Sequence, residues 1–584
     1  MRKMKSMFSR CVALMLVLAL AITLSPAAET QGQAKTAKAT VSMKAKSVMK
    51  YTLALANAEK DTVYYNGKSD IPYFELDSRR KEMQKTLKEN NPTKLTITSK
   101  VKGDKVTWTR KSTYGSTKVV FNYKKNTITF EDINEFFRQE GLSLVGAENG
   151  MGELMSLYEL DEESSYNRHG KQNIVINLNN YGIKLLKTKK KFYIPVQTYS
   201  TLFITRIGAF QVFNGENLFI TNDGSLGEMK DLYNSAKKKK FSKAFAAYNY
   251  GEVCLLYDTQ YGLKDTHDIT TFDKFFSDTG LATEIKSQDS IGTDVALCTA
   301  VNMYFDDRHC AFTCPSWNTD FEKFRTIVNA LPQGAYRNRT QALKTELFGY
   351  REKQMPEVLP YEEVGDTAYI TFDGFNYDPT ADHTKLPTDD ELMSLRDDTI
   401  RLVQYAMNKI NNNSDIKNVV LDLSLNGGGA IISADYLLAA FLGTSSMALK
   451  DTFTGAQSMV NYKVNTNLDN SFDEKDTLAG RGLNLYCFTS GVSYSCGNMV
   501  PAMFKDSEKV TLVGRVTGGG SCSVSYGATA SGGIVSISSP TRFSFTKNGG
   551  FYDVDRGAEP DVFMKDMSKL YDREYMNELL DSIK

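Results

Sequence analysis

The chain has 584 residues, of which 41% are hydrophobic and 24% are charged. This length and hydrophobic content predict roughly two to four folded domains and exclude a largely disordered protein. The 70 basic and 69 acidic residues leave a formal charge of +1, so no overall basic excess indicates nucleic acid as a partner.

The first 28 residues have the pattern of a secretory signal peptide. Four basic residues lie within the first ten positions, an uncharged stretch runs from Cys11 to Leu24, and small residues follow. The apolar run is shorter than the ~20 residues that a membrane-spanning helix needs. We therefore expect residues 1–28 to be cleaved from an exported protein with no transmembrane span, secreted or otherwise extracytoplasmic, including attachment at the cell surface. Retention of the segment as an N-terminal anchor is the alternative.

Residues 29–50 are predicted to be a linker, because the sequence there is rich in Lys, Ala and Thr and low in aromatic residues. Residues 51–226 are predicted to form a β-rich accessory region of one or two domains. Alternating β-branched and aromatic residues mark its strands. These strands include Lys94–Val101, Lys105–Arg110, Thr117–Tyr123 and Asn173–Leu178.

Residues 227–330 are predicted to be a helical segment, since apolar residues recur there at spacings of three and four. Residues 331–584 then alternate between strands and helices, which predicts an α/β domain with a mostly parallel sheet. Its expected strands are Asp366–Phe372, Lys417–Leu423, Leu483–Thr489 and Val510–Val513, and its expected helices are Asp398–Ile410, Ile432–Leu442 and one starting near Ser495. Active sites of such folds lie at the carboxyl ends of the strands.

Four short segments carry chemistry-bearing residues. They are Asp306–His309 (DDRH), Asp422–Gly429 (DLSLNGGG), Ser493–Asn498 (SYSCGN) and Val513–Gly520 (VGRVTGGG). Each is weak alone, and the glycine-rich turn fits neither phosphate-binding loop pattern.

Taken together and in this order, the segments resemble the tail-specific (C-terminal processing) proteases and their tricorn-core relatives. The resemblance covers roughly residues 230–584, and Gly557–Asp561 (GAEPD) is similar to the family's closing segment. It implies a crotonase-like α/β spiral as catalytic domain, preceded by the helical segment and the β-rich region. It also implies a serine-type peptidase with Ser495 as nucleophile.

Two departures from the tail-specific pattern favour the tricorn-like branch. The family's base is a lysine about 25 residues after the serine, but Gly520 stands at that distance from Ser495. The interval between His309 and Asp366 also leaves no room for a PDZ domain. The tricorn-like branch uses a histidine instead, and the DDRH segment resembles the one that carries it, so His309 is the expected base.

The residue types suit acyl transfer. A serine hydroxyl needs a base to remove its proton, and a histidine can take that proton near neutral pH. We expect the backbone N–H of Cys496, with one from Gly427 or Gly428, to hold the oxyanion. Arg308 occupies the place of a serine in the branch's relay. The residue that orients His309 is therefore sought among the aspartates Asp306, Asp307, Asp553 and Asp555, with Asp555 favoured.

Structural roles compete with these assignments. Ser495 suits a helix N-cap, and His309 suits a hydrogen-bonded structural histidine. We expect His169, His267 and His383 to lie at the surface. Asp422 is expected to fix the turn after its strand, and Asn426 to shape the glycine loop.

Seven cysteines follow Cys11, and none has zinc-ligand spacing, so no metal or other cofactor is expected. If the family fold holds, the loops of Cys496 and Cys522 lie close together, and a regulatory disulfide between them is a further hypothesis.

The leading functional hypothesis is a secreted serine endopeptidase that acts on peptides or unfolded proteins. A catalytically inactive peptide-binding protein on the same fold is the alternative. A third hypothesis makes Cys496 or Cys310 the nucleophile. The sequence predicts neither the natural substrate nor the oligomeric state.

Overall fold

The structure is a computed structural model that describes residues 41–89, 94–113, 115–138 and 156–583. The predicted signal peptide, residues 1–28, lies outside the described residues. Within the described ranges, no helix is long and apolar enough to cross a membrane.

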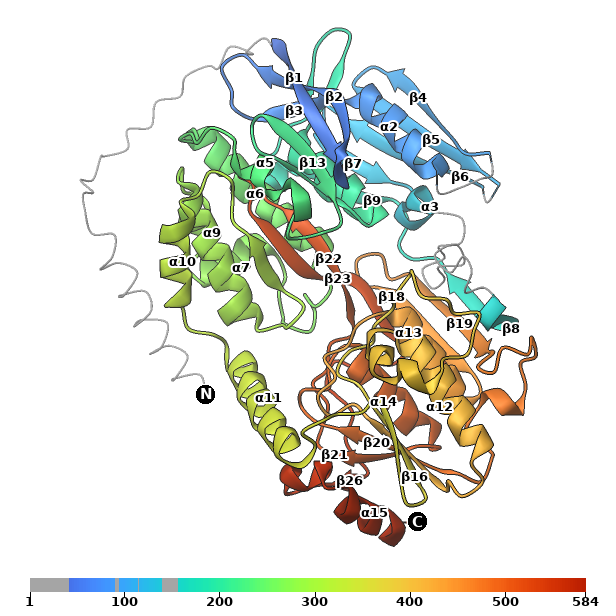
Figure 1. Cartoon of the computed structure of the whole chain (residues 1–584). Coiled ribbons are helices and arrows are strands. Elements are labelled where there is room, and N and C mark those ends of the chain that lie inside the picture. The colour runs from blue at the N-terminus through green and yellow to red at the C-terminus, as the bar shows by residue number, and fades with distance from the viewer. Residues whose placement is uncertain (1–40, 90–93, 114, 139–155, 584) are drawn as a thin grey trace.

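The N-terminal part contains two sheets, as the β-rich prediction required. The seven-stranded sheet has the order β10 (Leu186–Lys187), β11 (Phe192–Pro195), β3 (Pro72–Glu75), β2 (Ala54–Asn66), β1 (Met43–Thr52), β13 (Asn217–Thr221) and β12 (Phe210–Phe213). The five-stranded sheet has the order β4 (Thr96–Lys102), β5 (Lys105–Ser112), β6 (Gly115–Asn122), β7 (Thr127–Phe130) and β9 (Ile174–Asn177). Helices α2 (Leu76–Glu89) and α3 (Ile133–Phe137) accompany the strands at the top of Figure 1. Trp108, Phe121 and Phe203 form the aromatic centre of their shared core.

The structure differs from the sequence expectation at the predicted linker 29–50, because β1 begins at Met43 and pairs antiparallel with β2. This strand buries Val48, and Lys50 forms ion pairs with Glu59 and Glu82. Its other side chains are mostly exposed and polar, so the strand lacks the hydrophobic run that would have marked it.

The middle of the chain is helical. Its elements are α4 (Val196–Tyr199), η3 (Ser200–Ile204), η4 (Thr205–Ile207), α5 (Lys230–Asn234), α6 (Lys243–Gln260), α7 (Phe272–Asp278), α8 (Ala282–Ile285), α9 (Ser290–Thr299), η6 (Ala300–Phe305), α10 (Phe321–Asn329) and α11 (Ala335–Gln354). Tyr257, Phe272 and Phe305 lie ring against ring in its core. Helix α11 leaves this group and runs alone to the C-terminal part (Figure 1).

The C-terminal part is an α/β unit built on a mostly parallel sheet. The order is β15 (Tyr361–Val364), β16 (Thr367–Thr371), β17 (Asn418–Asp422), β20 (Asn484–Thr489), β21 (Thr511–Gly514) and β26 (Val562–Phe563). Only the β15–β16 pair is antiparallel. The strands expected from the sequence therefore lie side by side within a residue or two of their expected bounds.

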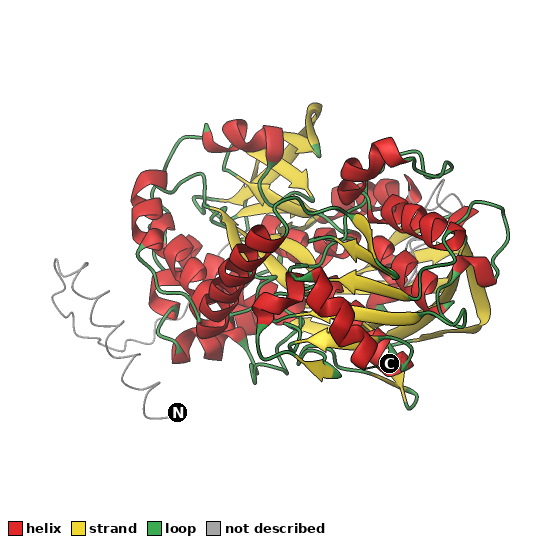
Figure 2. Ribbon diagram, turned by 60° about the horizontal axis from the view of Figure 1, so that its bottom comes forward, coloured by secondary structure: helices red, strands yellow, loops and turns green. Residues whose placement is uncertain are grey.

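Helices cover both faces of this parallel sheet. One face packs on α12 (Thr399–Asn412), α13 (Ile431–Leu442) and α14 (Cys496–Ser507), and the other on α11, η9 (Met567–Tyr571) and α15 (Arg573–Ser582). Along β17, Val419 and Leu421 face the first core while Val420 faces the second. Two-sided burial explains the continuous hydrophobic run of this strand. Figure 2 shows the C-terminal helix packed across the strands.

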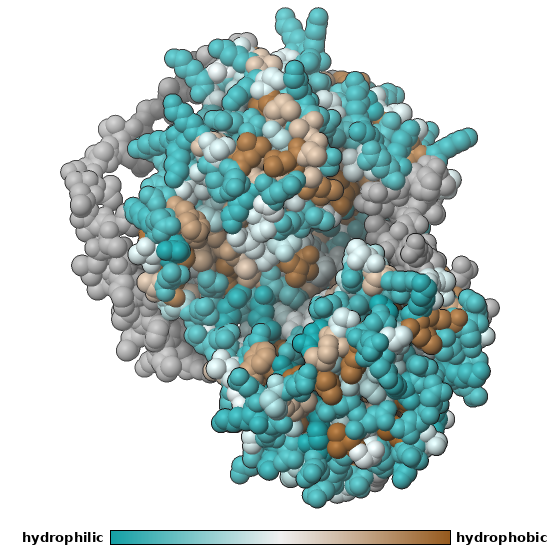
Figure 3. Space-filling model, viewed as in Figure 1, coloured by the Kyte–Doolittle hydropathy of each residue, from teal (hydrophilic) through white to brown (hydrophobic). Residues whose placement is uncertain are grey.

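One further sheet joins strands from all three predicted regions. Its order is β14 (Ala311–Cys314), β23 (Ile534–Ser544), β18 (Ser445–Asp451), β19 (Gln457–Val464) and β8 (Tyr158–Arg168), and β22 (Cys522–Ala528) pairs with β23 beside this path. The boundaries at 226/227 and 330/331 are therefore not structural divisions, because β8 and β14 pair with C-terminal strands. Figure 1 shows β22 and β23 running between the upper and lower parts. The face seen in Figure 3 is mostly hydrophilic, with small scattered hydrophobic groups.

Candidate active site

Ser495 lies on the turn between β20 and α14, directly before the helix. Its backbone has φ 58° and ψ −124°, a conformation that costs a non-glycine residue about 1–3 kcal/mol and marks functional sites. Ser495 is the N-cap residue of α14, as one interpretation expected, but its side chain makes no capping hydrogen bond, so capping does not account for the hydroxyl. A strained serine at a strand-to-helix turn exposes its Oγ above the sheet.

The glycine motifs pack directly against this turn. The N–H of Ser495 donates to the Gly519 carbonyl at 2.9 Å. A side chain at Gly428 would collide with Ser495, because its Cβ would lie 2.5 Å from the Ser495 Cβ. A side chain at Gly520 would enter the ring of Tyr494. These glycines are therefore needed where the loop backbone packs closely against the side chains of Tyr494 and Ser495.

His309 is brought to the serine turn by the sheet that joins the three regions. It lies two residues before the start of β14, and its carbonyl accepts a hydrogen bond from Ser536 on β23. Its ring packs edge-on against Tyr494, the residue before Ser495, with the ring centroids 4.8 Å apart. The two candidate residues, far apart in the chain, thus meet at the same loop.

The residues beside His309 also contact Tyr494. The hydroxyl of Tyr494 donates to Asp307 at 3.2 Å, and Asp307 also accepts the N–H of His309 at 3.0 Å. The Arg308 guanidinium lies 4.2 Å from the Tyr494 ring centroid, and it donates to the carbonyl of Val492. Asp307, Arg308 and His309 are therefore all anchored on the serine loop.

Within the described part of the chain, no hydrogen bond joins the Ser495 hydroxyl to the His309 ring. The Nδ1 atom of His309 is buried and has no hydrogen-bond partner. Burial lowers the pKa of His309 below its usual value, opposed by the charge of Asp307 and reinforced by that of Arg308. The imidazole is therefore neutral at neutral pH, the form that accepts a proton.

The structure does not place Asp555 on His309. The carboxylate of Asp555 accepts hydrogen bonds from the N–H and hydroxyl of Ser521 and forms an ion pair with Arg542. Asp555 raises the pKa of His309 only as the weakest of four influences. Asp553 also pairs with Arg542, and Asp306 accepts the first N–H groups of α11. Asp307 is the aspartate that acts most strongly on His309.

The two glycine amides expected to hold an oxyanion are already engaged. The N–H of Gly427 donates to the Asp373 carbonyl at 3.0 Å, and that of Gly428 donates to the Asn426 side chain at 2.8 Å. Among the described residues, the N–H groups of Cys496 and Gly429 donate to no oxygen and approach only the Cys496 thiol, and both residues line the cavity that contains Ser495. The sequence could not show which glycine the folded loop leaves free.

A cavity of about 250 Å³ opens beside Ser495, and both Cys496 and Cys522 line it, so their loops do lie close together. All seven described cysteines are free and buried. Burial raises the pKa of the Cys496 thiol to about 12 and that of Cys310 well above its usual value. Because the thiolate is the nucleophilic form, neither cysteine is poised to attack a substrate.

No group of His, Cys, Asp or Glu among the described residues is arranged to hold a metal ion.

Other polar residues lie as expected except two histidines, His267, which is half-buried and contacts Tyr261, and His383. Asp422 accepts the N–H of Ser424 at the end of β17, and Asn426 bridges the Phe372 carbonyl to the glycine loop. The surface expectation for His383 is wrong, because His383 is 7% exposed and hydrogen-bonds Asp398 at 2.8 Å. The residues around His383 in the sequence are polar, so they gave no indication that it pairs with Asp398, 15 residues away.

Two residues on α11 support the site, and sequence reasoning missed them. Arg337 donates to the carbonyls of Asp307 and Cys310 on either side of His309. The hydroxyl of Tyr336 donates to the Gly518 carbonyl at 2.6 Å. Neither residue lies in a recognisable motif, so only the three-dimensional contact reveals this role.

Residues 366–564 match the family model described as Peptidase family S41. This part of the chain is therefore similar to peptidase family S41, and the matched region contains both glycine motifs, Ser495 and Asp555. His309 lies before the matched region. A search of the curated proteins finds no match.

The solved structures that match this chain share little sequence with it. A putative peptidase from Parabacteroides merdae is 14% identical, over 57% of this chain and 95% of that chain, with a TM-score of 0.38. Mature CPAF complexed with lactacystin is 11% identical, over 58% of this chain and 97% of that chain, with a TM-score of 0.36. The photosystem II D1 C-terminal processing protease is 16% identical over 34% of this chain, with a TM-score of 0.24, and the match spans 42% of its length.

Proposed function

We propose that the protein is a serine endopeptidase of the tricorn-like branch, with Ser495 as nucleophile and His309 as general base. The observation that carries this proposal is the packing of His309 on Tyr494, next to a strained Ser495 that makes no capping bond. We also propose that residues 331–584 form a crotonase-like spiral. The parallel sheet with helices on both faces supports this fold.

The proposed reaction is acyl transfer. The Ser495 Oγ attacks the peptide carbonyl while a ring nitrogen of His309 takes the hydroxyl proton. The N–H groups of Cys496 and Gly429 stabilise the oxyanion, and each such donor is typically worth about 3–4 kcal/mol. His309 then gives the proton to the leaving amine. Water, deprotonated by the same ring, hydrolyses the acyl-enzyme.

The roles of the aspartates follow from their contacts. Asp307 holds the backbone of His309 and faces the same Tyr494, so we propose it as the residue that positions the histidine. Asp555 instead secures Ser521 and Arg542 beside the cavity.

We further propose that the protein acts outside the cytoplasm on peptides or unfolded proteins. The basic and apolar segments of residues 1–28 support export. Mass analysis of the N-terminus of protein recovered from the medium or cell surface tests this, and an intact, cytoplasmic N-terminus would contradict it.

A non-catalytic peptide-binding protein remains the competing candidate. Its support is the absence of a Ser495–His309 hydrogen bond in the described residues and of a partner on His309 Nδ1. Hydrolysis of an unfolded fluorogenic protein by wild type, Ser495→Ala and His309→Ala separates the two. Catalysis predicts activity only in wild type and in the controls Ser471→Ala and His267→Asn, which alter residues outside the site. Peptide binding without turnover in the wild type would select the competing candidate.

A further inference from the structure

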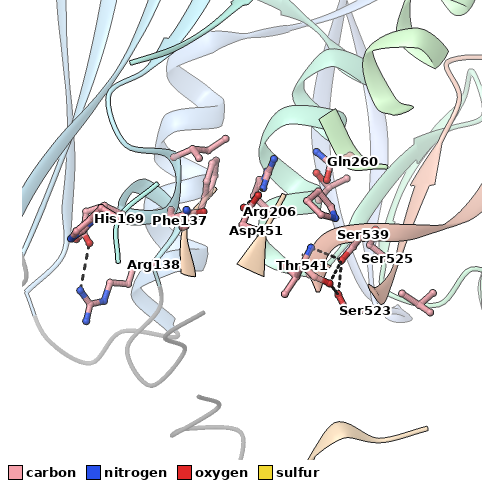
Figure 4. A pocket seen from close by; sticks show the side chains of 18 of the residues that line it. Phe137, Arg138, His169, Arg206, Gln260, Asp451, Ser523, Ser525, Ser539 and Thr541 are labelled. Carbon is pink, nitrogen blue, oxygen red and sulfur yellow. Dashed lines mark hydrogen bonds and ion pairs between the residues drawn. The ribbon is translucent and has the colours of Figure 1, made fainter. Parts of the chain in front are cut away.

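A second cavity, of about 370 Å³, lies next to the Ser495 cavity and shares part of its wall. Both cavities are lined by Ser523 and Val524 on β22. The second one continues along β22 and β23 to α3, η4 and the ends of β8 and α6. Figure 4 shows the labelled residues of its lining. Its polar lining residues include Glu135, Arg138, Arg168, His169, Arg206, Gln260, Asp451, Ser525, Ser539 and Thr541.

The charge on this lining is positive. Three arginines and two carboxylates face the cavity, which leaves one net positive charge with His169 neutral. Glu135 is paired with Arg138 at 3.5 Å on the same short helix end. The cavity therefore favours an anionic group over a cationic one.

Arg206 is the cation at the centre of the cavity, and its hydrogen bonds are incomplete. Its side chain is 12% exposed, and its Nε is buried without a partner. Its two terminal nitrogens make long hydrogen bonds of 3.4 Å, to Asp451 and to the carbonyl of Thr259, and the guanidinium lies 5.1 Å from the centroid of the Phe453 ring. Asp451 already accepts the N–H groups of Phe453 and Thr454 through its other oxygen. Burial lowers the pKa of Arg206. A guanidinium in this state gains from a ligand that offers two oxygens in a plane.

The wall shared with the Ser495 cavity suits an extended peptide. Among the described strands β22 pairs only with β23, which leaves its other edge open near Ser523. An extended chain adds readily to such an edge. Val524 is 46% exposed at the point where the two cavities meet, and it offers an apolar contact there.

We propose that this cavity is a substrate subsite that binds a carboxylate of the peptide through Arg206, while the scissile bond lies at Ser495. The ligand is a Glu or Asp side chain, or a terminal carboxylate, of a peptide that follows the edge of β22. This inference rests on the proposed function, and it adds a preference for acidic substrates.

Peptide binding to the full-length Ser495→Ala variant tests the subsite without requiring turnover. A labelled peptide set carries one Glu at successive positions, with a Gln peptide matched to each and with free or amidated C-termini. Charge-assisted hydrogen bonds predict roughly 10-fold to 100-fold tighter binding for Glu at one or two adjacent positions. A preference that persists in amidated peptides identifies a side chain, and one that depends on the free C-terminus identifies the terminal carboxylate.

Variants of the arginines locate the effect. Arg206→Gln in the same background is expected to bring the Glu-to-Gln ratio close to one. Arg138→Gln, at the cavity rim, is expected to lower the Glu-to-Gln ratio by a smaller amount. This variant replaces Arg206→Gln as the test if Arg206→Gln does not fold. Arg325→Gln, an exposed arginine on α10, is the matched control and keeps the ratio.

The outcomes separate this inference from the proposed function. Equal binding of Glu and Gln peptides at every position, or no binding of any peptide, overturns the carboxylate subsite. A Glu preference that survives Arg206→Gln and Arg138→Gln also overturns it. If the wild type prefers Glu peptides but does not cleave them, the subsite is supported and the proposed peptidase activity is contradicted.

Discussion

The ring of His309 packs edge-on against the ring of Tyr494, with 4.8 Å between their centroids. Tyr494 is 5% exposed and is fixed by Asp307, by Arg308 and by the close approach of Gly520. Tyr494, the residue before the proposed nucleophile, thus provides the surface against which the ring of the proposed base packs. This ring contact places the His309 side chain beside the turn that carries Ser495.

The first prediction concerns that ring. Tyr494→Ala should lower the rate of serine labelling by a fluorophosphonate at least about 100-fold, because it releases both His309 and the Ser495 turn. It should also cost about 3–5 kcal/mol of unfolding free energy. Tyr494→Phe keeps the ring and loses only the hydroxyl bond to Asp307, so a cost of about 1 kcal/mol and a small rate change are expected. Equal rate losses in the two variants would contradict the role of the ring.

The second prediction concerns pH. Since burial lowers the pKa of His309 below 6.5, the labelling rate should stay high at neutral pH and fall as the pH drops below that value. Arg308→Met removes a charge that lowers this pKa and should move the acid limb to higher pH. Asp307→Asn removes a charge that raises it and should move the limb to lower pH. A profile that does not shift in either variant would show that another group titrates.

The third prediction concerns α11. Arg337→Met removes donors to the carbonyls on both sides of His309, so the labelling rate should fall roughly 10-fold to 100-fold. Arg339→Met, two residues along the same helix and exposed, is the control and should label like the wild type. Rescue by Arg337→Lys, which keeps the charge but not the planar fork, should be incomplete. Full activity of Arg337→Met would remove this residue from the positioning of the histidine.

The fourth prediction concerns the glycine loop. Asn426 is fully buried, and its side chain holds both the Phe372 carbonyl and the Gly428 N–H. Asn426→Ala leaves both groups unsatisfied and should cost about 2–4 kcal/mol in denaturant unfolding, together with a loss of labelling. The exposed Asn412→Ala on α12 serves as the control, and a similar small cost in both variants would show that the loop does not depend on Asn426.

The C-terminal strands and helices could be predicted from the sequence because their signals are local. β17 is a continuous hydrophobic run since both faces of the sheet are covered, and α12 starts where the Asp398 side chain caps the N–H of Arg401. The four segments in family order likewise predicted which loops would meet, and residues 366–564 match the family.

The remaining features depend on contacts between distant parts of the chain. β1 is a polar strand that is stabilised by its neighbours, and β8 leaves the N-terminal region to pair with β19. The partner of Asp555 is Arg542 rather than His309, because the two residues meet only once β23 is in place. The Asn426 side chain accepts the N–H of Gly428. The neighbouring glycines have the same residue type, so the sequence could not show which of their N–H groups would form this bond.

Mass-spectrometric mapping of the fluorophosphonate adduct shows whether Ser495 is a nucleophile that His309 activates. In that case, we expect a single adduct on the peptide that contains Ser495 in the wild type at pH 7, and none in Ser495→Ala or His309→Ala. An adduct on another residue, or full labelling of Ser495 in His309→Ala, would contradict a serine nucleophile activated by His309.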